Sequence, residues 1–158
     1  MDAGELGRFW SHVVCGPEVT DCWFWVGAIA DDGYGRFALR RDGRERMVRP
    51  HRVMFEHVTG AELTSSVPLM HECDIPICVH AAVDAGSHLS IGSQSLNMLD
   101  REHKGRAGRG GLGMRGLSRR VLTERSRRLR AVVLAAGWDR AAIAAVLADV
   151  PVDHPRLF

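Results

Sequence analysis

One stretch of the chain, residues 71–97, brings two cysteines and three histidines, all of them possible ligands of a transition metal, close together in sequence. Cys73 and Cys78 stand five residues apart, with His71 just before them and His88 ten residues after Cys78. Thiolates and imidazoles are ligands that zinc prefers, and close spacing closes such a site at little cost in loop entropy. We therefore expect this part of the chain to fold around a tetrahedral ion.

A closed zinc site needs four ligands, and the stretch supplies more candidates than are required. Cys22 is the best fourth ligand, because it opens an apolar aromatic segment that is typical of a core strand. His88 is the preferred third ligand, and His80, two residues after Cys78, is its rival. If zinc is complete without His71, that imidazole is free to act as a general base near neutral pH.

The pattern extends to Asn97, which follows His88 by nine residues. In order and spacing these residues resemble the His-Cys box homing endonucleases, the zinc-bearing branch of the HNH or ββα-metal nucleases. The first half of the chain is similar to phage-type HNH endonucleases. The matching segments there are Cys22-Trp23-x-Trp25-x-Gly27, Gly33-Tyr34-Gly35 and His51-Arg52.

The resemblance implies a division of roles. His71 would activate the attacking water, and Asn97, on a closing helix, would hold one catalytic divalent ion, magnesium. The structural zinc would be bound by Cys22, Cys73, Cys78 and His88. A neutral imidazole as base and a hard cation on the phosphate oxygens are what phosphodiester hydrolysis requires.

The spacing departs from the family at one point. Cys78 and His88 are ten residues apart, where the family usually has five. We interpret the difference as a five-residue insertion, because Leu89 and the nine-residue step to Asn97 are kept. Three simpler interpretations stay open: reduced thiols in an apolar core, a purely structural zinc site with a solvated His71, and an Asn97 that is only a polar helix residue.

Positive charge is concentrated in one segment. Residues 101–130 contain eleven Lys or Arg and two Glu, whereas the whole chain carries a net charge of only +2. A basic block after a nuclease helix indicates a polyanionic partner, here double-stranded DNA. The candidate DNA-binding residues are Arg52, Lys104, Arg106, Arg109, Arg115, Arg119 and Arg120.

The pattern of apolar and turn residues predicts an α+β fold with a small ββα-metal core and a C-terminal helical hairpin. Three parts are expected: a zinc-bearing nuclease domain over residues 1–104, a flexible Gly/Arg-rich linker over 105–117 and a helical module over 118–158. The helical module is either a helix-turn-helix that reads DNA or a hairpin for packing or dimerisation.

Several elements can be placed within these parts. Strands are expected at residues 23–28, 34–39, 46–48, 67–70 and 88–91. Helices are expected around residues 9–14, from Pro50 to Gly60, over residues 93–103, and on both sides of Gly137.

The sequence thus favours a metal-dependent DNA endonuclease, with a zinc-stabilised DNA-binding or regulatory protein as the alternative. Only the endonuclease needs His71 and Asn97. The acidic first residues lack the features of a signal peptide, and four cysteines without an export signal favour metal over disulfides, so a cytoplasmic location is expected. Cleavage of both strands with one site per chain would imply a homodimer.

Overall fold

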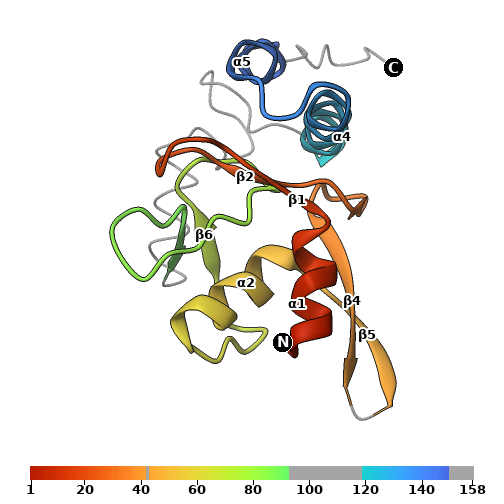
Figure 1. Ribbon diagram of the computed structural model, residues 1–158, viewed down its shortest axis with the longest axis vertical. Helices are drawn as coiled ribbons and strands as arrows, with labels where there is room; N and C mark the ends of the chain where they lie inside the picture. The colour runs from red at the N-terminus through yellow and green to blue at the C-terminus, as the bar shows by residue number, and fades with distance from the viewer. Residues whose placement is uncertain (42, 93–118, 150–158) are drawn as a thin grey trace, which may run out of the picture.

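The computed structural model describes residues 1–41, 43–92 and 119–149, and it confirms a mixed α+β fold with small sheets (Figure 1). In these residues two sheets have two strands, β1–β2 and β6–β7, and one has three, β3–β4–β5. The helices are α1 (Ala3–Trp10), α2 (Pro50–Thr59), α4 (Arg119–Ala136) and α5 (Arg140–Ala148). The strands are β1 (Val13–Cys15), β2 (Trp23–Trp25), β3 (Ala28–Ile29), β4 (Gly35–Arg41), β5 (Arg44–Val48), β6 (Leu69–His71) and β7 (Leu89–Ile91).

The amino-terminal helix differs from the expected one. It begins earlier, because Asp2 and Glu5 form a capping box, in which each side chain accepts a hydrogen bond from the other's backbone N–H. It ends at Trp10, and the residues after it form β1, where Val13 pairs with Trp25. The expectation of helix at Val13 and Val14 was therefore wrong, because two β-branched residues found a strand partner.

The core begins with aromatic rings from three elements. Phe9 of α1, Trp25 of β2 and Phe37 of β4 lie with their ring centroids 5.2–5.4 Å from one another. All three are buried. Gly35 is needed beside them, since a Cβ there would come within 2.6 Å of the Trp25 ring and 2.9 Å of Pro50.

Helix α2 agrees with its sequence signals. Pro50 occupies the first turn, where its missing N–H costs nothing, and Gly60 ends the helix in a left-handed conformation with φ 71°. The helix buries His51, Val53, Met54 and Phe55. The expected helix over residues 93–103, which carries Asn97, and the linker over 105–117 lie outside the described residues.

The metal-binding segments meet through the backbone. Phe24 of β2 forms an antiparallel bridge with Cys78, where Trp25 N donates to Ile77 O and Val79 N donates to Trp23 O, both at 2.8 Å. Paired residues in an antiparallel bridge point to one side, and so do residues two apart on a strand. Cys22 is therefore carried toward the side on which Cys78 lies.

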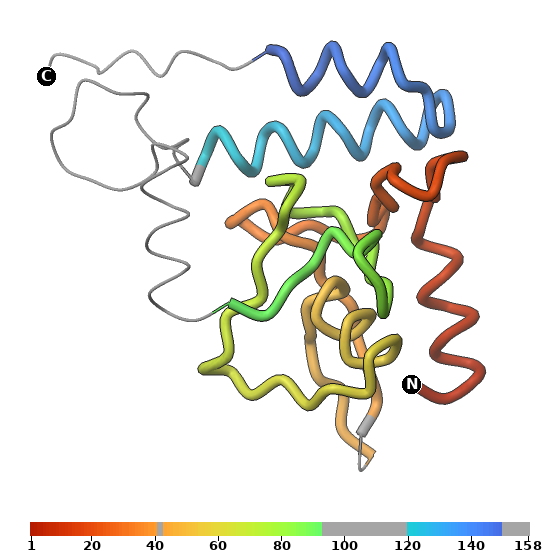
Figure 2. The backbone as a smooth tube through the Cα atoms, turned by 90° about the vertical axis from the view of Figure 1, so that its left-hand side faces the viewer, coloured from red at the N-terminus to blue at the C-terminus, as the bar shows by residue number. Residues whose placement is uncertain are grey.

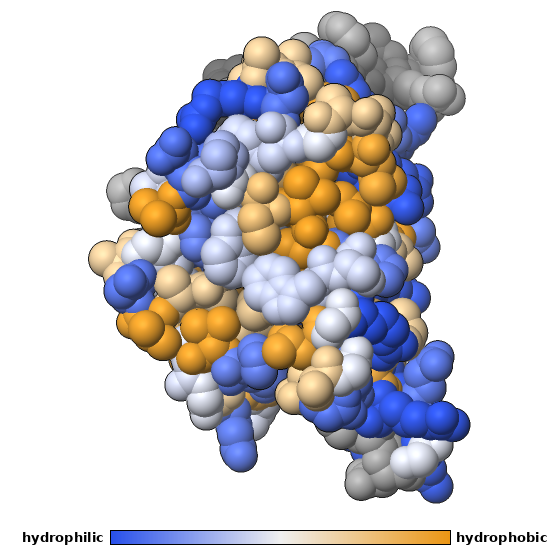
Figure 3. Space-filling model, viewed as in Figure 1, coloured by the Kyte–Doolittle hydropathy of each residue, from blue (hydrophilic) through white to orange (hydrophobic). Residues whose placement is uncertain are grey.

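The C-terminal helices pack on the sheets and do not stand apart. Figure 2 shows α4 and α5 side by side above β1 and β2, and Figure 3 shows an apolar area of the surface just below α4. Leu129 and Val133 of α4 and Ile143 and Val146 of α5 are buried in the same core as Phe24. The sequence had suggested a separate module, but the helices and the sheets share one core.

The α4–α5 turn follows the expected chemistry. Gly137 adopts φ 71° after α4, and the Asp139 side chain accepts a hydrogen bond from Ala142 N to cap α5. The described helices include none long and apolar enough to span a membrane.

Replacing Leu129 with alanine tests the shared core. Leu129 is completely buried, so we expect Leu129→Ala to lower the free energy of unfolding by about 2–5 kcal/mol in a single transition. Leu134→Ala on the same helix, where the side chain is 54% exposed, should change it by less than about 0.5 kcal/mol. Urea denaturation followed by Trp fluorescence measures both. An unchanged transition for Leu129→Ala would mean that the hairpin folds independently.

Candidate metal centre and histidine pair

Four of the predicted ligands converge. The ligand atoms of Cys22, Cys73, Cys78 and His88 all lie within 4.8 Å of one another, close enough to hold one metal ion. His88 Nδ1 lies 3.4 Å from Cys22 Sγ and 3.6 Å from Cys78 Sγ. In a tetrahedral zinc site a coordinated nitrogen and sulfur are about 3.6 Å apart, given the usual Zn–N and Zn–S lengths. The donor set and its spacing therefore fit zinc.

The orientation of His88 also suits a ligand. Its Nε2–H donates to the carbonyl oxygen of Thr20 at 3.1 Å, which leaves the lone pair of Nδ1 pointing at the sulfurs. A carbonyl on the far nitrogen is the usual support of a metal-binding imidazole, because it fixes the tautomer and the ring plane.

His80, the rival ligand, lies next to the group but outside it. Its Nδ1–H donates to the carbonyl of Asp21 at 2.7 Å, and its ring stacks on Trp23 with the centroids 4.1 Å apart. The metal-binding group of the described residues thus contains His88 and not His80.

A backbone hydrogen bond closes the segment between His80 and His88. His88 N donates to His80 O at 3.1 Å. Residues 81–87, which lie between the two, therefore form a closed loop. Glu72 N donates to His88 O at 3.0 Å, next to the pairing of His71 with Leu89 in the β6–β7 sheet. The length of this loop therefore does not affect the register of the β6–β7 pairing.

The pKa values of the three thiols are shifted in different directions. Hydrogen bonds from Cys22 and then Cys78 lower the pKa of Cys73, whereas the hydrogen bond to Cys73 raises the pKa of Cys22. Burial is the main cause that raises the pKa of Cys78. The thiol of Cys73 is therefore the most acidic of the three. A bound dication would favour all three thiolates, because its charge opposes their repulsion and their desolvation.

His71, the predicted general base, ends β6 and is 8% exposed. Both of its ring nitrogens are buried, and neither has a nitrogen or oxygen partner at hydrogen-bond distance among the described residues. Its imidazole is nevertheless near enough to Cys73 to contribute, after the two other cysteines, to the lowered pKa of that thiol. The position of His71 next to Cys73 thus brings a histidine that is outside the candidate ligand group close to that group.

A second histidine, His51, lies beside His71, and together they form what we call the histidine pair. The ring centroids are 4.9 Å apart, and Tyr34 packs against both at 5.2 and 5.9 Å. Burial is the first cause that lowers the pKa of His51 well below its usual value, followed by the charge of His71. His51 therefore stays neutral beside His71.

An arginine borders the histidine pair. The Arg49 guanidinium lies 4.6 Å from the centre of the Tyr34 ring, and its Nη2 contacts the Asp32 carboxylate at 2.6 Å. Arg49 Nη1 and His51 Nδ1 are buried without hydrogen-bond partners in the part of the chain that the structure describes, as are both nitrogens of His71. Leaving a buried polar group unpaired costs about 1–3 kcal/mol, so each of these four atoms calls for a partner such as a water or a bound molecule.

Sequence reasoning did not single out His51, Tyr34 or Arg49 as site residues. His51 and Tyr34 belonged to the motifs of the resemblance, but nothing in the sequence alone places α2 and the β3–β4 turn beside His71. Gly33, with φ 85°, is the one local signal, since that turn requires a left-handed residue before Tyr34.

The predicted DNA-binding residues are spread between described and undescribed parts of the chain. Arg52 donates to the carbonyls of Val67 at 2.9 Å and Thr64 at 2.7 Å, so its guanidinium fastens the loop before β6. Arg119 begins α4 and Arg120 is exposed. The remaining candidates, like Asn97, lie outside the described residues: Lys104, Arg106, Arg109 and Arg115.

Several other arginines of α4 fasten the helix to the rest of the chain. Arg125 donates to Asp74 O and Arg130 to Val26 O, both at 2.8 Å, and Arg128 pairs with Asp149 at 2.7 Å. Part of the basic block between residues 101 and 130 is therefore explained by docking inside the protein.

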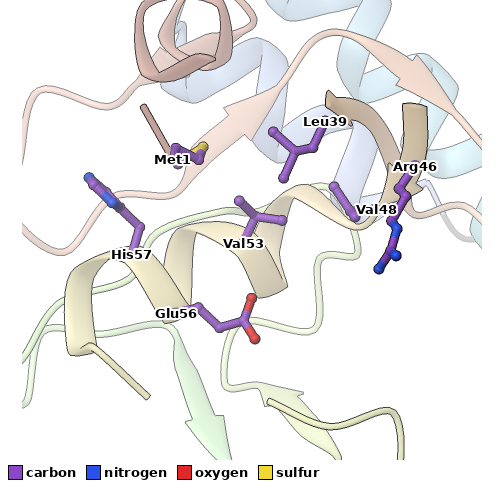
Figure 4. A pocket seen from close by; sticks show the side chains of 7 residues that line it. All are labelled: Met1, Leu39, Arg46, Val48, Val53, Glu56 and His57. Carbon is purple, nitrogen blue, oxygen red and sulfur yellow. The ribbon is translucent and has the colours of Figure 1, made fainter. Parts of the chain in front are cut away.

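A separate pocket of about 420 Å³ lies on the far side of α2 from His51 (Figure 4). Val53, Glu56 and His57 line it from α2, and helical periodicity places them opposite His51. Glu56 already accepts a hydrogen bond from Leu63 N. The buried, unpartnered polar atoms of the described chain do not include any from the lining of this pocket.

Two histidine variants test the ligand set. We expect wild-type protein to carry one zinc per chain after dialysis and His88→Ala to carry far less, because Nδ1 of His88 is a donor of the group. His80→Ala should keep its zinc, since that ring only donates to a carbonyl. Elemental analysis measures all three, and loss of zinc from His80→Ala but not from His88→Ala would reverse the assignment.

No family model matches this chain, and no solved structure matches it. The chain is 35% identical over 91 residues to Protein 2.8 of Escherichia phage T7, an alignment that covers 58% of this chain and 56% of the relative. The chain thus spans a little over half the length of the relative it matches.

Proposed function

We propose that this protein is a zinc-stabilised DNA endonuclease that hydrolyses phosphodiester bonds. The observation that carries the proposal is His71, a buried imidazole whose two nitrogens have no nitrogen or oxygen partner among the described residues, two residues from Cys73 of the candidate metal group. Zinc supports this assignment by holding the knuckle that positions His71. The resemblance to the His-Cys box nucleases, drawn from the residues of the sequence, points to the same role.

The chemistry assigned to the histidine pair follows from its surroundings. A neutral His71 accepts a proton from a water molecule and so makes it a nucleophile toward phosphorus. His51 stays uncharged, so it does not oppose the positive charge that His71 then acquires. Arg49 Nη1, buried and without a partner in the described chain, is a donor for a phosphate oxygen.

A divalent ion completes the proposed reaction. Magnesium, bound with the help of Asn97, would neutralise charge on the phosphate and on the leaving 3′ oxygen. Asn97 is proposed on its spacing from His88 alone.

Exposed positive charge on the β4–β5 hairpin also favours a polyanionic partner. Four arginines of the β4–β5 hairpin are exposed, namely Arg36, Arg40, Arg44 and Arg46. The alternative function, DNA binding without catalysis, uses the same zinc site but leaves the unpartnered nitrogens of His71 without a purpose.

The histidine test uses plasmid DNA. Purified protein should cleave it when Mg²⁺ is present, and His71→Ala should slow cleavage by a factor of about 10²–10⁴ while its zinc content stays at the wild-type level. His57→Ala is the matched control, because His57 is an exposed histidine on α2. Binding without cleavage by the wild type would favour the alternative function. Loss of zinc from His71→Ala would mean that His71 is itself a ligand.

The Asn97→Ala variant tests the magnesium role. We expect slower cleavage that recovers in part at high Mg²⁺, because the side chain is assigned only to hold the ion. Initial rates over a range of Mg²⁺ concentrations give the answer. Full activity of Asn97→Ala at low Mg²⁺ would contradict the assignment.

The linker arginines are tested by salt dependence. Replacing Arg106, Arg109 and Arg115 with alanine should weaken DNA binding and reduce the slope of log K against log salt by about 0.9 for each phosphate that the protein no longer neutralises. Fluorescence anisotropy without Mg²⁺ measures binding. Arg128→Ala, which removes only the ion pair with Asp149, is the control and should keep the wild-type slope. A triple variant with the wild-type slope would show that the linker does not touch DNA.

A further inference from the structure

The backbone carbonyls of Thr20, Asp21 and Cys22, just before β2, each accept a hydrogen bond from an aromatic ring. The Thr20 carbonyl takes His88 Nε2–H, the Asp21 carbonyl takes His80 Nδ1–H at 2.7 Å, and the Cys22 carbonyl takes Trp138 Nε1–H at 3.0 Å. Two of these rings come from the metal-binding hairpin. The third, the indole of Trp138, comes from the turn between α4 and α5.

Trp138 is built closely into this position. Its ring packs on Gly16, where a Cβ would come within 2.7 Å of the indole. Gly16 N also donates to the Cys22 carbonyl, at 3.2 Å. The carbonyl of this ligand residue is therefore held from two sides.

The residue that begins α5 adds an ionic contact. Arg140 Nη2 lies 3.2 Å from the Asp21 carboxylate, which is only 7% exposed, and its guanidinium lies over the Trp138 ring at 5.3 Å. The Asp21 carboxylate also accepts a hydrogen bond from Glu18 N, so the contact ties α5 to the loop before Cys22.

The α4–α5 hairpin also contacts the segment that carries Cys73. Arg125 of α4 donates to the carbonyl of Asp74, the residue after Cys73, at 2.8 Å. Cys22 and Cys73 belong to segments that are 51 residues apart in sequence. The α4–α5 hairpin contacts both of them, on the backbone next to the ligands.

We propose that the α4–α5 hairpin is a clamp on the zinc site and that Trp138 is a positioning residue for Cys22. This inference rests on the proposed zinc. Cys22 is the ligand farthest in sequence from the other three, so local chain geometry constrains it least. Hydrogen bonds behind the ligands commonly change metal affinity by about 10–100-fold. The clamp makes zinc retention depend on the docked hairpin, and by linkage zinc favours docking.

Zinc release from the full-length holoprotein tests the clamp. A chromophoric chelator in excess traps the released ion, and the first-order rate is read from its absorbance. We expect Trp138→Phe, which keeps most of the ring packing but removes the N–H, to release zinc about tenfold faster than the wild type. Apparent affinity for Co²⁺, followed by the visible bands of the thiolate complex, should weaken by a similar factor.

Two controls separate positioning from general loss of stability. Trp10→Phe makes the same exchange at a partly exposed ring, whose N–H has no hydrogen bond within the described part of the chain, and should release zinc at the wild-type rate. Leu39→Ala removes buried apolar surface in β4 and should lower the melting temperature without changing the release rate. A purely structural Trp138 would behave as Leu39 does.

The outcomes are distinct. Zinc in the wild type with equal release from folded Trp138→Phe would overturn the clamp and leave the zinc site intact, whereas a wild type without zinc would overturn both. If Trp138→Phe does not fold, Arg140→Ala replaces it, because that side chain is exposed and its removal leaves the core unchanged. Faster release from Arg140→Ala would support the clamp, and release at the wild-type rate would overturn it.

Discussion

The short antiparallel contact between β2 and residues 77–79 is the constraint on which the rest of the structure depends. Two backbone hydrogen bonds, from Trp25 to Ile77 and from Val79 to Trp23, place Cys22 beside Cys78. They act together with the ring hydrogen bonds to the carbonyls of Thr20 and Asp21, which hold the segment of Cys22 against the same part of the chain. The aromatic core stabilises the same strand from its other end, since Trp25 packs against both Phe9 and Phe37.

The same constraint organises the candidate site. Since Cys73 is fixed in the ligand group, His71 is fixed two residues away, and its pairing with Leu89 holds the backbone. Helix α2 then brings His51 against it. The unpartnered atoms of the histidine pair are thus held by two rigid elements, which is what positioning of a reacting group requires.

Much of this was accessible from the sequence, and the reasons are local. Ligand spacing predicted the metal-binding group, and Pro50, Gly60, Gly137 and Asp139 predicted where helices begin and end, because capping acts over a few residues. The contact of Tyr34 with the histidines and the docking of α4 and α5 were not predictable, because they depend on packing between distant segments. A basic block such as that of α4 looks the same in sequence whether its arginines donate to core carbonyls or to phosphate.

The closed loop over residues 81–87 has a consequence for how chains of this kind can vary. The backbone hydrogen bond between His80 and His88 closes this loop. The length of the loop therefore does not affect the β6–β7 hairpin that carries His71 and His88. Val83, Asp84 and Ala85 are exposed at its tip. Such a tip tolerates insertion, so a reporter peptide or an accessory domain could be grafted there without altering the geometry at the metal.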